Sequence, residues 1–174
     1  AHFGNFVQDL LGQQVRLDEL LFGLLVSSGN DAAVALAQLS HGSEDALVAA
    51  MNRLASDLGL GGTRFTDVSG LSAENQTTAA DLARFLRVHR ERYGSLLAPI
   101  YRAPGFVFPR TANLMPDPSR FRIQQPIAQN NRNVFLSLLD GADGIKTGYT
   151  EAAGYNLAFS ATRAGRGILG AVFG

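Results

Sequence analysis

The sequence contains no cysteine and only one lysine among its 174 residues. Without cysteine, disulfide bonds and thiolate metal sites are excluded. The other fourteen basic side chains are all arginine, which suggests that Lys146 stands where a planar, permanently charged guanidinium will not serve. Apolar stretches are short, and none approaches the length of a membrane span. No signal peptide is visible and the chain begins at Ala1, which is typical of a processed or excised piece.

The formal net charge is also zero at pH 7, so no strong field for nucleic acid or membrane is implied and no nucleic-acid partner is expected. The charges are unevenly spread. Residues 1–95 carry seven arginines against eleven acids, and residues 96–174 carry eight basic groups against four acids. The basic half holds the only lysine and therefore suits an anionic ligand. The length and a hydrophobic content of 46% fit one soluble globular domain.

Hydrophobic periodicity predicts helices in the first half of the chain. Leucines within residues 17–25 recur at helical spacing and indicate one buried face. After an interruption, Asn30 or Asp31 is expected to cap a second helix that ends near Leu39. Ser43 is expected to cap a third helix.

A fourth helix is predicted to open at the capping box Thr78-x-x-Asp81 and to end near Tyr93. Three basic residues are expected on its solvated face: Arg84, Arg87 and Arg90. All six prolines lie between Pro99 and Pro126, so residues 96–143 are expected to be extended or looped.

The end of the chain has the pattern of β-strands. Three strands are predicted, over residues 144–150, 155–162 and 168–173. In the second of them apolar and polar residues alternate, which is typical of a half-buried strand. A turn over residues 163–167 connects it to the third. Helices over residues 15–95 followed by strands over residues 144–174 predict a single α+β domain.

Two short motifs carry side chains suited to serine acyl transfer, Ser28-Gly29-Asn30 and Lys146-Thr147-Gly148. A serine hydroxyl can relay a proton, and a neighbouring amide can hold a substrate carbonyl. A lysine across the cleft can stabilise an oxyanion and ease the deprotonation of a hydroxyl. The simpler alternatives are that the second motif is a chance surface tripeptide and that Ser28 and Asn30 only cap the helix that follows.

Taken together, the two motifs make the chain resemble the D-alanyl-D-alanine carboxypeptidases, the low-molecular-mass penicillin-binding proteins. Segments 20–33 and 143–150 carry the most specific likeness, and the resemblance extends from about Val15 to Gly174. Further matching elements are Met51-Asn52, Leu58-Gly59-Leu60, Thr63-x-Phe65, Ser69-Gly70-Leu71, Thr78-Ala79-x-Asp81-Leu82-Ala83 and Asn131-x-Asn133. The resemblance implies part of a β-lactamase/transpeptidase-like fold, with a helical subdomain followed by antiparallel strands and without its N-terminal portion.

The same resemblance implies catalytic roles for three residues. Ser28 would be the second catalytic serine, in the proton relay, and Asn30 would bind the substrate amide. Lys146 would face Ser28 across the cleft. We therefore expect the Ser28 hydroxyl and the Lys146 ammonium to lie about 2.7–3.2 Å apart, or to be bridged by one water or anion.

Substrate binding is implied for Lys146 and the three residues after it. Thr147 would hold the terminal carboxylate of a peptidoglycan stem peptide that ends in D-Ala-D-Ala. Gly148 would let the substrate backbone lie close to the strand. The backbone N–H of Tyr149 would be one donor of the oxyanion hole. β-Lactam antibiotics would acylate the same site.

One element of the family is missing from the chain. The nucleophile of these enzymes belongs to a Ser-x-x-Lys element before S-G-N, and a chain whose only lysine is Lys146 cannot contain it. The resemblance therefore implies that this chain forms two walls of the active-site cleft of an extracytoplasmic, bacterial serine carboxypeptidase. The isolated chain would be inactive. The missing element would come from an absent segment or from a second polypeptide.

Two other functions stay open. One is a non-catalytic peptidoglycan-binding homologue that keeps the cleft without the nucleophile. The other is a class A-like β-lactamase, for which Glu74 is the only candidate deacylating glutamate, although its surroundings indicate a helix lead-in.

A third motif is set aside. Gly165-x-Gly167-x-x-Gly170 matches a dinucleotide fingerprint, but the chain ends four residues later, so the helix and carboxylate that this motif needs are missing. The three histidines are scattered without ligand spacing. Neither a cofactor nor a metal is expected.

Overall fold

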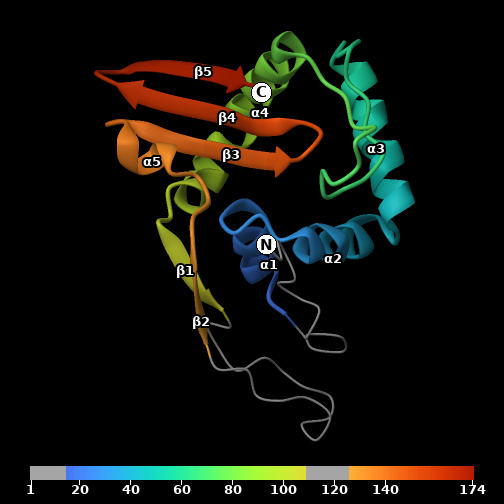
Figure 1. The fold of residues 1–174 in the computed structure, drawn as a ribbon, viewed down its shortest axis with the longest axis horizontal. Coiled ribbons are helices and arrows are strands. Elements are labelled where there is room, and N and C mark those ends of the chain that lie inside the picture. The colour runs from blue at the N-terminus through green and yellow to red at the C-terminus, as the bar shows by residue number, and fades with distance from the viewer. Residues whose placement is uncertain (1–14, 109–125) are drawn as a thin grey trace, which may run out of the picture.

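The computed structural model describes residues 15–108 and 126–174. In chain order, the helices and strands of these residues are α1 (Leu17–Leu25), α2 (Asn30–His41), α3 (Glu44–Asp57), α4 (Ala79–Tyr101), β1 (Gly105–Phe108), β2 (Ile127–Asn130), α5 (Phe135–Leu138), β3 (Ala142–Thr150), β4 (Gly154–Arg163) and β5 (Arg166–Val172). Most of the helices come first and the long antiparallel strands last (Figure 1), which confirms the predicted α+β class.

The predicted caps of α3 and α4 are confirmed. The Ser43 hydroxyl accepts a hydrogen bond from the Ala46 N–H at 3.1 Å. The Thr78 hydroxyl accepts one from the Asp81 N–H, also at 3.1 Å. Each bond satisfies a backbone donor in the first turn of its helix, where no intrahelical acceptor is available.

The first two helices differ from the prediction in detail. Leu17 is 54% exposed at the first turn of α1, whereas the side chain of Glu19 is fully buried, so the leucines do not form one continuous buried face. The expected cap of α2 by Asn30 or Asp31 is wrong. Gly29 occupies the N-cap position without a side-chain hydrogen bond, and Asn30 is already the first helical residue.

The predicted end of α4 near Tyr93 is wrong, because the helix continues to Tyr101 and contains Pro99. A proline near the end of a helix removes one hydrogen bond, and burial of Ile100 and Tyr101 in the next two positions offsets that loss. The prediction of an extended or looped segment over residues 96–143 agrees with the strands β1 and β2, but it is wrong for the end of α4 and for α5, which are helical. The prolines within residues 109–125 lie outside the described residues.

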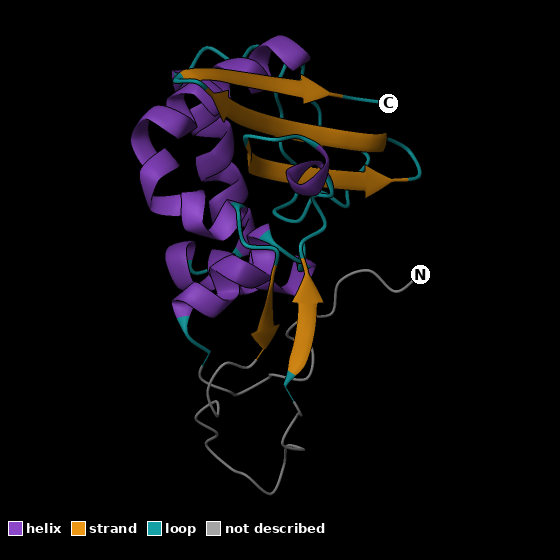
Figure 2. Ribbon diagram, turned by 90° about the vertical axis from the view of Figure 1, so that its left-hand side faces the viewer, coloured by secondary structure: helices purple, strands orange, loops and turns teal. Residues whose placement is uncertain are grey.

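The strands form two sheets. β1 pairs with β2, and β3, β4 and β5 form an antiparallel sheet in that order (Figure 2). The turn between β4 and β5 is shorter than predicted, since Arg163 pairs directly with Arg166. Ala164 and Gly165, with φ of 49° and 74°, make the two-residue connection, and this left-handed pair matches the twist of the flanking strands.

Contacts from α4 change which residues the three-stranded sheet buries. The helix runs along this sheet and contacts β3 and β5. As a result Ser160, expected on the polar side of β4, is buried, whereas Tyr155 on the expected apolar side is 76% exposed. The expected solvated position of Arg90 is also wrong, because its guanidinium donates to the Thr162 hydroxyl at 2.8 Å.

The hydrophobic core lies where the end of α1 meets the end of α4 and β1. Its buried members are Val26, Ile100, Phe106 and Phe108. Phe22 adds its ring at 5.5 Å from that of Phe106. This cluster fixes the end of α1, and with it the loop that carries the first motif.

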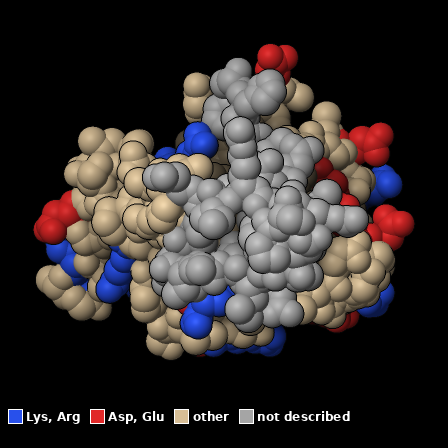
Figure 3. All heavy atoms as spheres, turned by 90° about the horizontal axis from the view of Figure 1, so that it is seen from below, with Lys and Arg blue, Asp and Glu red and all other residues tan. Residues whose placement is uncertain are grey.

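None of the helices in the described ranges is long and apolar enough to cross a bilayer. On the face shown in Figure 3, the acidic and basic side chains of the described residues are interspersed. This mixture agrees with a formal net charge of zero.

Candidate active site

Ser28 and Lys146, which are 118 residues apart in the sequence, are in direct contact. The Lys146 Nζ donates a hydrogen bond to the Ser28 Oγ at 2.6 Å and a second to the Thr147 carbonyl at 2.6 Å. The contact is slightly shorter than the expected range and needs no bridging water. The structure therefore brings the two motifs together, as predicted.

The loop between α1 and α2 holds Ser28 in an unusual conformation. Its φ of 59° lies in the left-handed region, which costs a non-glycine residue roughly 1–2 kcal/mol. The loop is tied to Gly23, whose carbonyl accepts from the Gly29 N–H at 2.8 Å and from the buried Ser27 hydroxyl at 3.0 Å. Strain of this kind persists where the surroundings over-determine it, and it clusters at functional sites.

The capping alternative for the first motif is wrong. No side chain caps α2, and the Ser28 hydroxyl accepts from Lys146 instead. A hydroxyl that accepts from an ammonium still has its own proton to donate. Asn30 follows at the first position of α2, where it is half-buried.

Lys146 has a perturbed acidity. Burial, with a further contribution from the charge of Arg132, lowers the pKa of Lys146 to about 8. The ammonium therefore exchanges its proton close to neutral pH, which an arginine at this position cannot do. Perturbed pKa values of this kind are concentrated at functional sites.

The strand that carries Lys146 has an open edge. Within the described residues β3 pairs only with β4, so an extended peptide can add along its other side. Gly148 is exposed there, and a Cβ added to it would come no closer than 4.0 Å, to the Cβ of Asn156. At the tip of the hairpin the rings of Tyr149 and Tyr155 lie 4.5 Å apart and are both exposed.

The loop after β2 forms a third side of the site. The amide of Asn131 donates to the Ala103 carbonyl at 2.8 Å, and the Arg132 N–H donates to the Val26 carbonyl at 3.0 Å. These bonds hold Arg132 near Lys146. The motif Asn131-x-Asn133 indicated the two asparagines of this segment but not Arg132 between them, whose only signal was its place in that motif.

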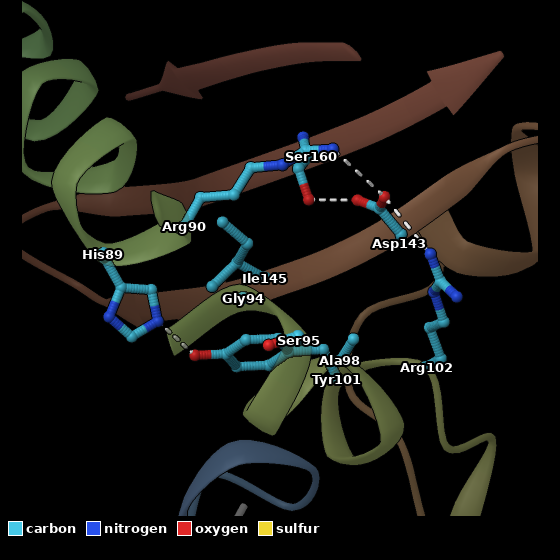
Figure 4. A pocket seen from close by; sticks show the side chains of 10 residues that line it. All are labelled: His89, Arg90, Gly94, Ser95, Ala98, Tyr101, Arg102, Asp143, Ile145 and Ser160. Carbon is cyan, nitrogen blue, oxygen red and sulfur yellow. Dashed lines mark hydrogen bonds and ion pairs between the residues drawn. The ribbon is translucent and has the colours of Figure 1, made fainter. Parts of the chain in front are cut away.

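Behind Lys146, Asp143 centres a polar cluster whose contacts the matching segment 143–150 did not reveal. The carboxylate accepts a hydrogen bond from the Ser160 hydroxyl and forms ion pairs with Arg90 and Arg102 (Figure 4). It also accepts a hydrogen bond from the Thr162 hydroxyl. Burial raises the pKa of Asp143, but the two hydroxyls and the two guanidinium groups outweigh that effect and hold the pKa below its usual value. The carboxylate is therefore ionised at neutral pH.

The arrangement is suited to acid–base chemistry on a hydroxyl and to binding an anion. Ser28 can pass a proton along while Lys146 and Arg132 supply positive charge. Within the described ranges, no group of three or more His, Asp or Glu side chains converges as metal ligands would.

Comparison with known proteins places this geometry in a family. The profile of the D-alanyl-D-alanine carboxypeptidase family matches residues 4–174. The carboxypeptidase DacA of Escherichia coli (strain K12) is 38% identical over 171 residues, which cover 94% of this chain and 37% of that protein. A D-alanyl-D-alanine carboxypeptidase of Streptomyces sp. (strain K15) is 31% identical over 170 residues, covering 94% of this chain and 56% of that protein.

Solved structures show the same likeness. The crystal structure of DacD from Francisella tularensis superposes with a TM-score of 0.79 at 30% identity, over 92% of this chain and 48% of that one. The DD-transpeptidase of Streptomyces K15 superposes with a TM-score of 0.80 at 29% identity, over 93% of this chain and 62% of that one. The chain thus spans less than two thirds of the length of these relatives.

Proposed function

The chain belongs to the D-alanyl-D-alanine carboxypeptidase family, and from this premise we propose that it forms two walls of a serine carboxypeptidase active site. The enzyme would cleave the terminal D-alanine from peptidoglycan stem peptides through an acyl-enzyme, and β-lactams would acylate it. The observation that carries the proposal is the 2.6 Å contact between Lys146 and Ser28. The family assignment favours this function over the β-lactamase alternative.

The proposed catalytic roles follow from the contacts of each group. Ser28 relays a proton between the nucleophile and the leaving nitrogen, because its hydroxyl accepts from Lys146 and keeps a proton to donate. Lys146 supplies the positive charge that stabilises a developing oxyanion. Asn30, half-buried at the first position of α2, binds the substrate amide.

Substrate binding is assigned to β3. Thr147 binds the terminal carboxylate, and the nearby charges of Lys146 and Arg132 favour an anion there. Gly148 fits this assignment, since nothing within the described chain comes near the place of its missing Cβ. The backbone N–H of Tyr149 serves as an oxyanion-hole donor.

The nucleophile lies outside these 174 residues, because the sequence contains no Ser-x-x-Lys element. Asn133 supports an incomplete site. Its side chain is buried at 5% exposure, and neither its Nδ2 nor its Oδ1 has a hydrogen-bond partner among residues 15–108 and 126–174. Such buried amides are rare in complete proteins. We propose that a further segment of the full-length protein, or a second polypeptide, brings the Ser-x-x-Lys element to this side of the cleft.

A peptidoglycan substrate implies that the protein works outside the cytoplasmic membrane of a bacterium. The test is D-alanine release from a stem-peptide analogue ending in D-Ala-D-Ala, with the full-length protein. We expect Ser28→Ala to reduce release by about 10²–10⁴-fold, the range for loss of general acid–base catalysis. The matched control is Ser40→Ala, an exposed serine at the far end of α2. Substrate binding without any D-alanine release would instead favour the non-catalytic homologue.

A further inference from the structure

Asp143 occupies a bulge in β3, three positions before Lys146. Ala142 pairs with Ala161 and Gly144 pairs with Ser160, so Asp143 has no partner residue on β4. A bulge of this kind re-aims the side chain of the extra residue, and such bulges are frequent beside active sites. The bulge at Asp143 is therefore expected to serve the residues that follow it in β3.

The re-aimed carboxylate ties together three elements. From β4, the Ser160 hydroxyl donates to its Oδ1 and the Thr162 hydroxyl donates to its Oδ2 at 3.0 Å. From α4 and its C-cap, the guanidinium groups of Arg90 and Arg102 approach Oδ2 to 3.8 and 3.4 Å. The Asp143 side chain is only 10% exposed, whereas those of Arg90 and Arg102 are 35% and 59% exposed, so only the carboxylate end of the ion pairs is shielded from water.

Packing between α4 and β3 is limited around this carboxylate. A cavity of about 360 Å³ separates the two elements, with Arg90, Ala98, Ile145 and Ser160 among its lining (Figure 4). The backbone of Gly144 makes the close approach, because a Cβ there would lie 3.2 Å from the Cβ of Tyr101. The ion pairs of Asp143 with Arg90 and Arg102 therefore join β3 to α4 beside this cavity, in addition to the backbone pairing of β3 with β4.

We propose that Asp143 is a positioning residue for Lys146. It holds β3 in the register in which the Lys146 ammonium reaches Ser28. A one-residue slip in register turns every following side chain to the other face of the sheet. Asp143 opposes this because its carboxylate bonds both β4 hydroxyls in the observed register, and a slip of β3 would break these bonds. The inference rests on the proposed function of Lys146 and names the residue that holds the lysine in place.

A positional effect and a charge effect of Asp143 on Lys146 shift the pKa of Lys146 in opposite directions when the carboxylate is removed. If Asp143 acts by position, its loss lets the Lys146 ammonium meet more water, and the pKa of Lys146 rises toward its ordinary value. If Asp143 acted through its charge, removal of a negative group would lower the pKa of Lys146 further. The charges facing the cluster, Arg90 and Arg102, remain in place in either case.

The experiment is an NMR titration of the full-length protein labelled with ¹³C at lysine Cε. Lys146 is the only lysine of this sequence, and its signal is assigned by its loss in Lys146→Arg. We expect a midpoint near 8 in the unchanged protein and a rise of about one pH unit or more in Asp143→Asn. The matched control is Asp67→Asn, another hydrogen-bonded aspartate, in the loop before α4, which should leave the midpoint unchanged.

A second readout separates this inference from the proposed function. In an active enzyme, Asp143→Asn should lower the turnover number for D-alanine release by about 10²-fold, the scale of a small misplacement. The lysine titration needs no catalysis, so it tests the inference even if no D-alanine is released. An unchanged or lowered midpoint in folded Asp143→Asn overturns the positioning role, whatever the enzyme does.

A milder variant covers the case in which Asp143→Asn does not fold. Ser160→Ala removes one hydroxyl from the cluster and keeps the carboxylate charge. We expect its Lys146 midpoint to rise by less than that of Asp143→Asn and its turnover to fall. A midpoint and a turnover that both match the unchanged protein would contradict the proposal.

Discussion

Replacing Lys146 with arginine separates positive charge from the geometry and acidity of the lysine. With a pKa of about 8, about ten Lys146 side chains are protonated for each neutral one at pH 7, and the ratio is reversed at pH 9. If the ammonium is the active form, the rate constant for acylation by benzylpenicillin falls about tenfold for each pH unit above 8. Arginine stays protonated over this range, so the variant should show no such decline.

The size of the effect at pH 7 follows from the fit of the ammonium. Its Nζ donates to both the Ser28 Oγ and the Thr147 carbonyl at 2.6 Å, a space that a guanidinium overfills. Loss of one preorganised donor costs about 10²–10³ in rate, and we expect Lys146→Arg to lose that much. The assay is stopped-flow acylation of the full-length protein from pH 6 to 10, with Arg166→Lys at the exposed start of β5 as the control. Acylation of the variant at the unchanged rate would refute the reasoning.

Three substitutions are expected to change the stability of the fold. Because burial lowers the pKa of Lys146, its charge destabilises the fold below pH 8, and this cost disappears by about pH 10.5. Lys146→Met should therefore raise the free energy of unfolding at pH 7 by up to about 3 kcal/mol, measured by urea titration. No gain in stability would argue against a buried ammonium. Ala164→Gly should add about 0.5–1 kcal/mol by relieving the left-handed φ of the turn, and a loss of stability on thermal unfolding would disprove that strain. Burial raises the pKa of Asp67, but hydrogen bonds from Asn75 and from backbone N–H groups outweigh it and lower the pKa, so Asp67→Ala should cost about 2–3 kcal/mol at pH 7. That cost should shrink as the pH falls through the folded pKa, below the ordinary 3.8; a constant cost down to pH 2 would exclude the carboxylate as its source.

Local signals in the sequence predicted local structure well. The caps at Ser43 and Thr78 depend on residues within one turn, and both are present. The helix that continues through Pro99 was not predicted, because burial of Ile100 and Tyr101 against other elements overrides the local preference. The same tertiary burial explains why the alternation in β4 failed at Ser160, which α4 covers.

The candidate site was also predicted only in part. Ser28 and Lys146 were predicted together because each belongs to a recognisable motif, although nothing in the spacing itself gives their distance. Asp143 lies in the matched segment 143–150, but its partners do not follow from that motif, since Arg90 comes from α4 and Thr162 from β4. Such contacts depend on how α4 lies against the sheet, which periodicity does not report.

The most direct test of a split active site is the location of the penicilloyl group. The full-length protein is incubated with benzylpenicillin, digested and analysed by mass spectrometry, and the isolated 174-residue chain is treated in parallel. We predict one acyl adduct, on the serine of a Ser-x-x-Lys element outside these residues, and none on the isolated chain. A stoichiometric adduct on Ser28 or on any other serine of this chain would contradict the account.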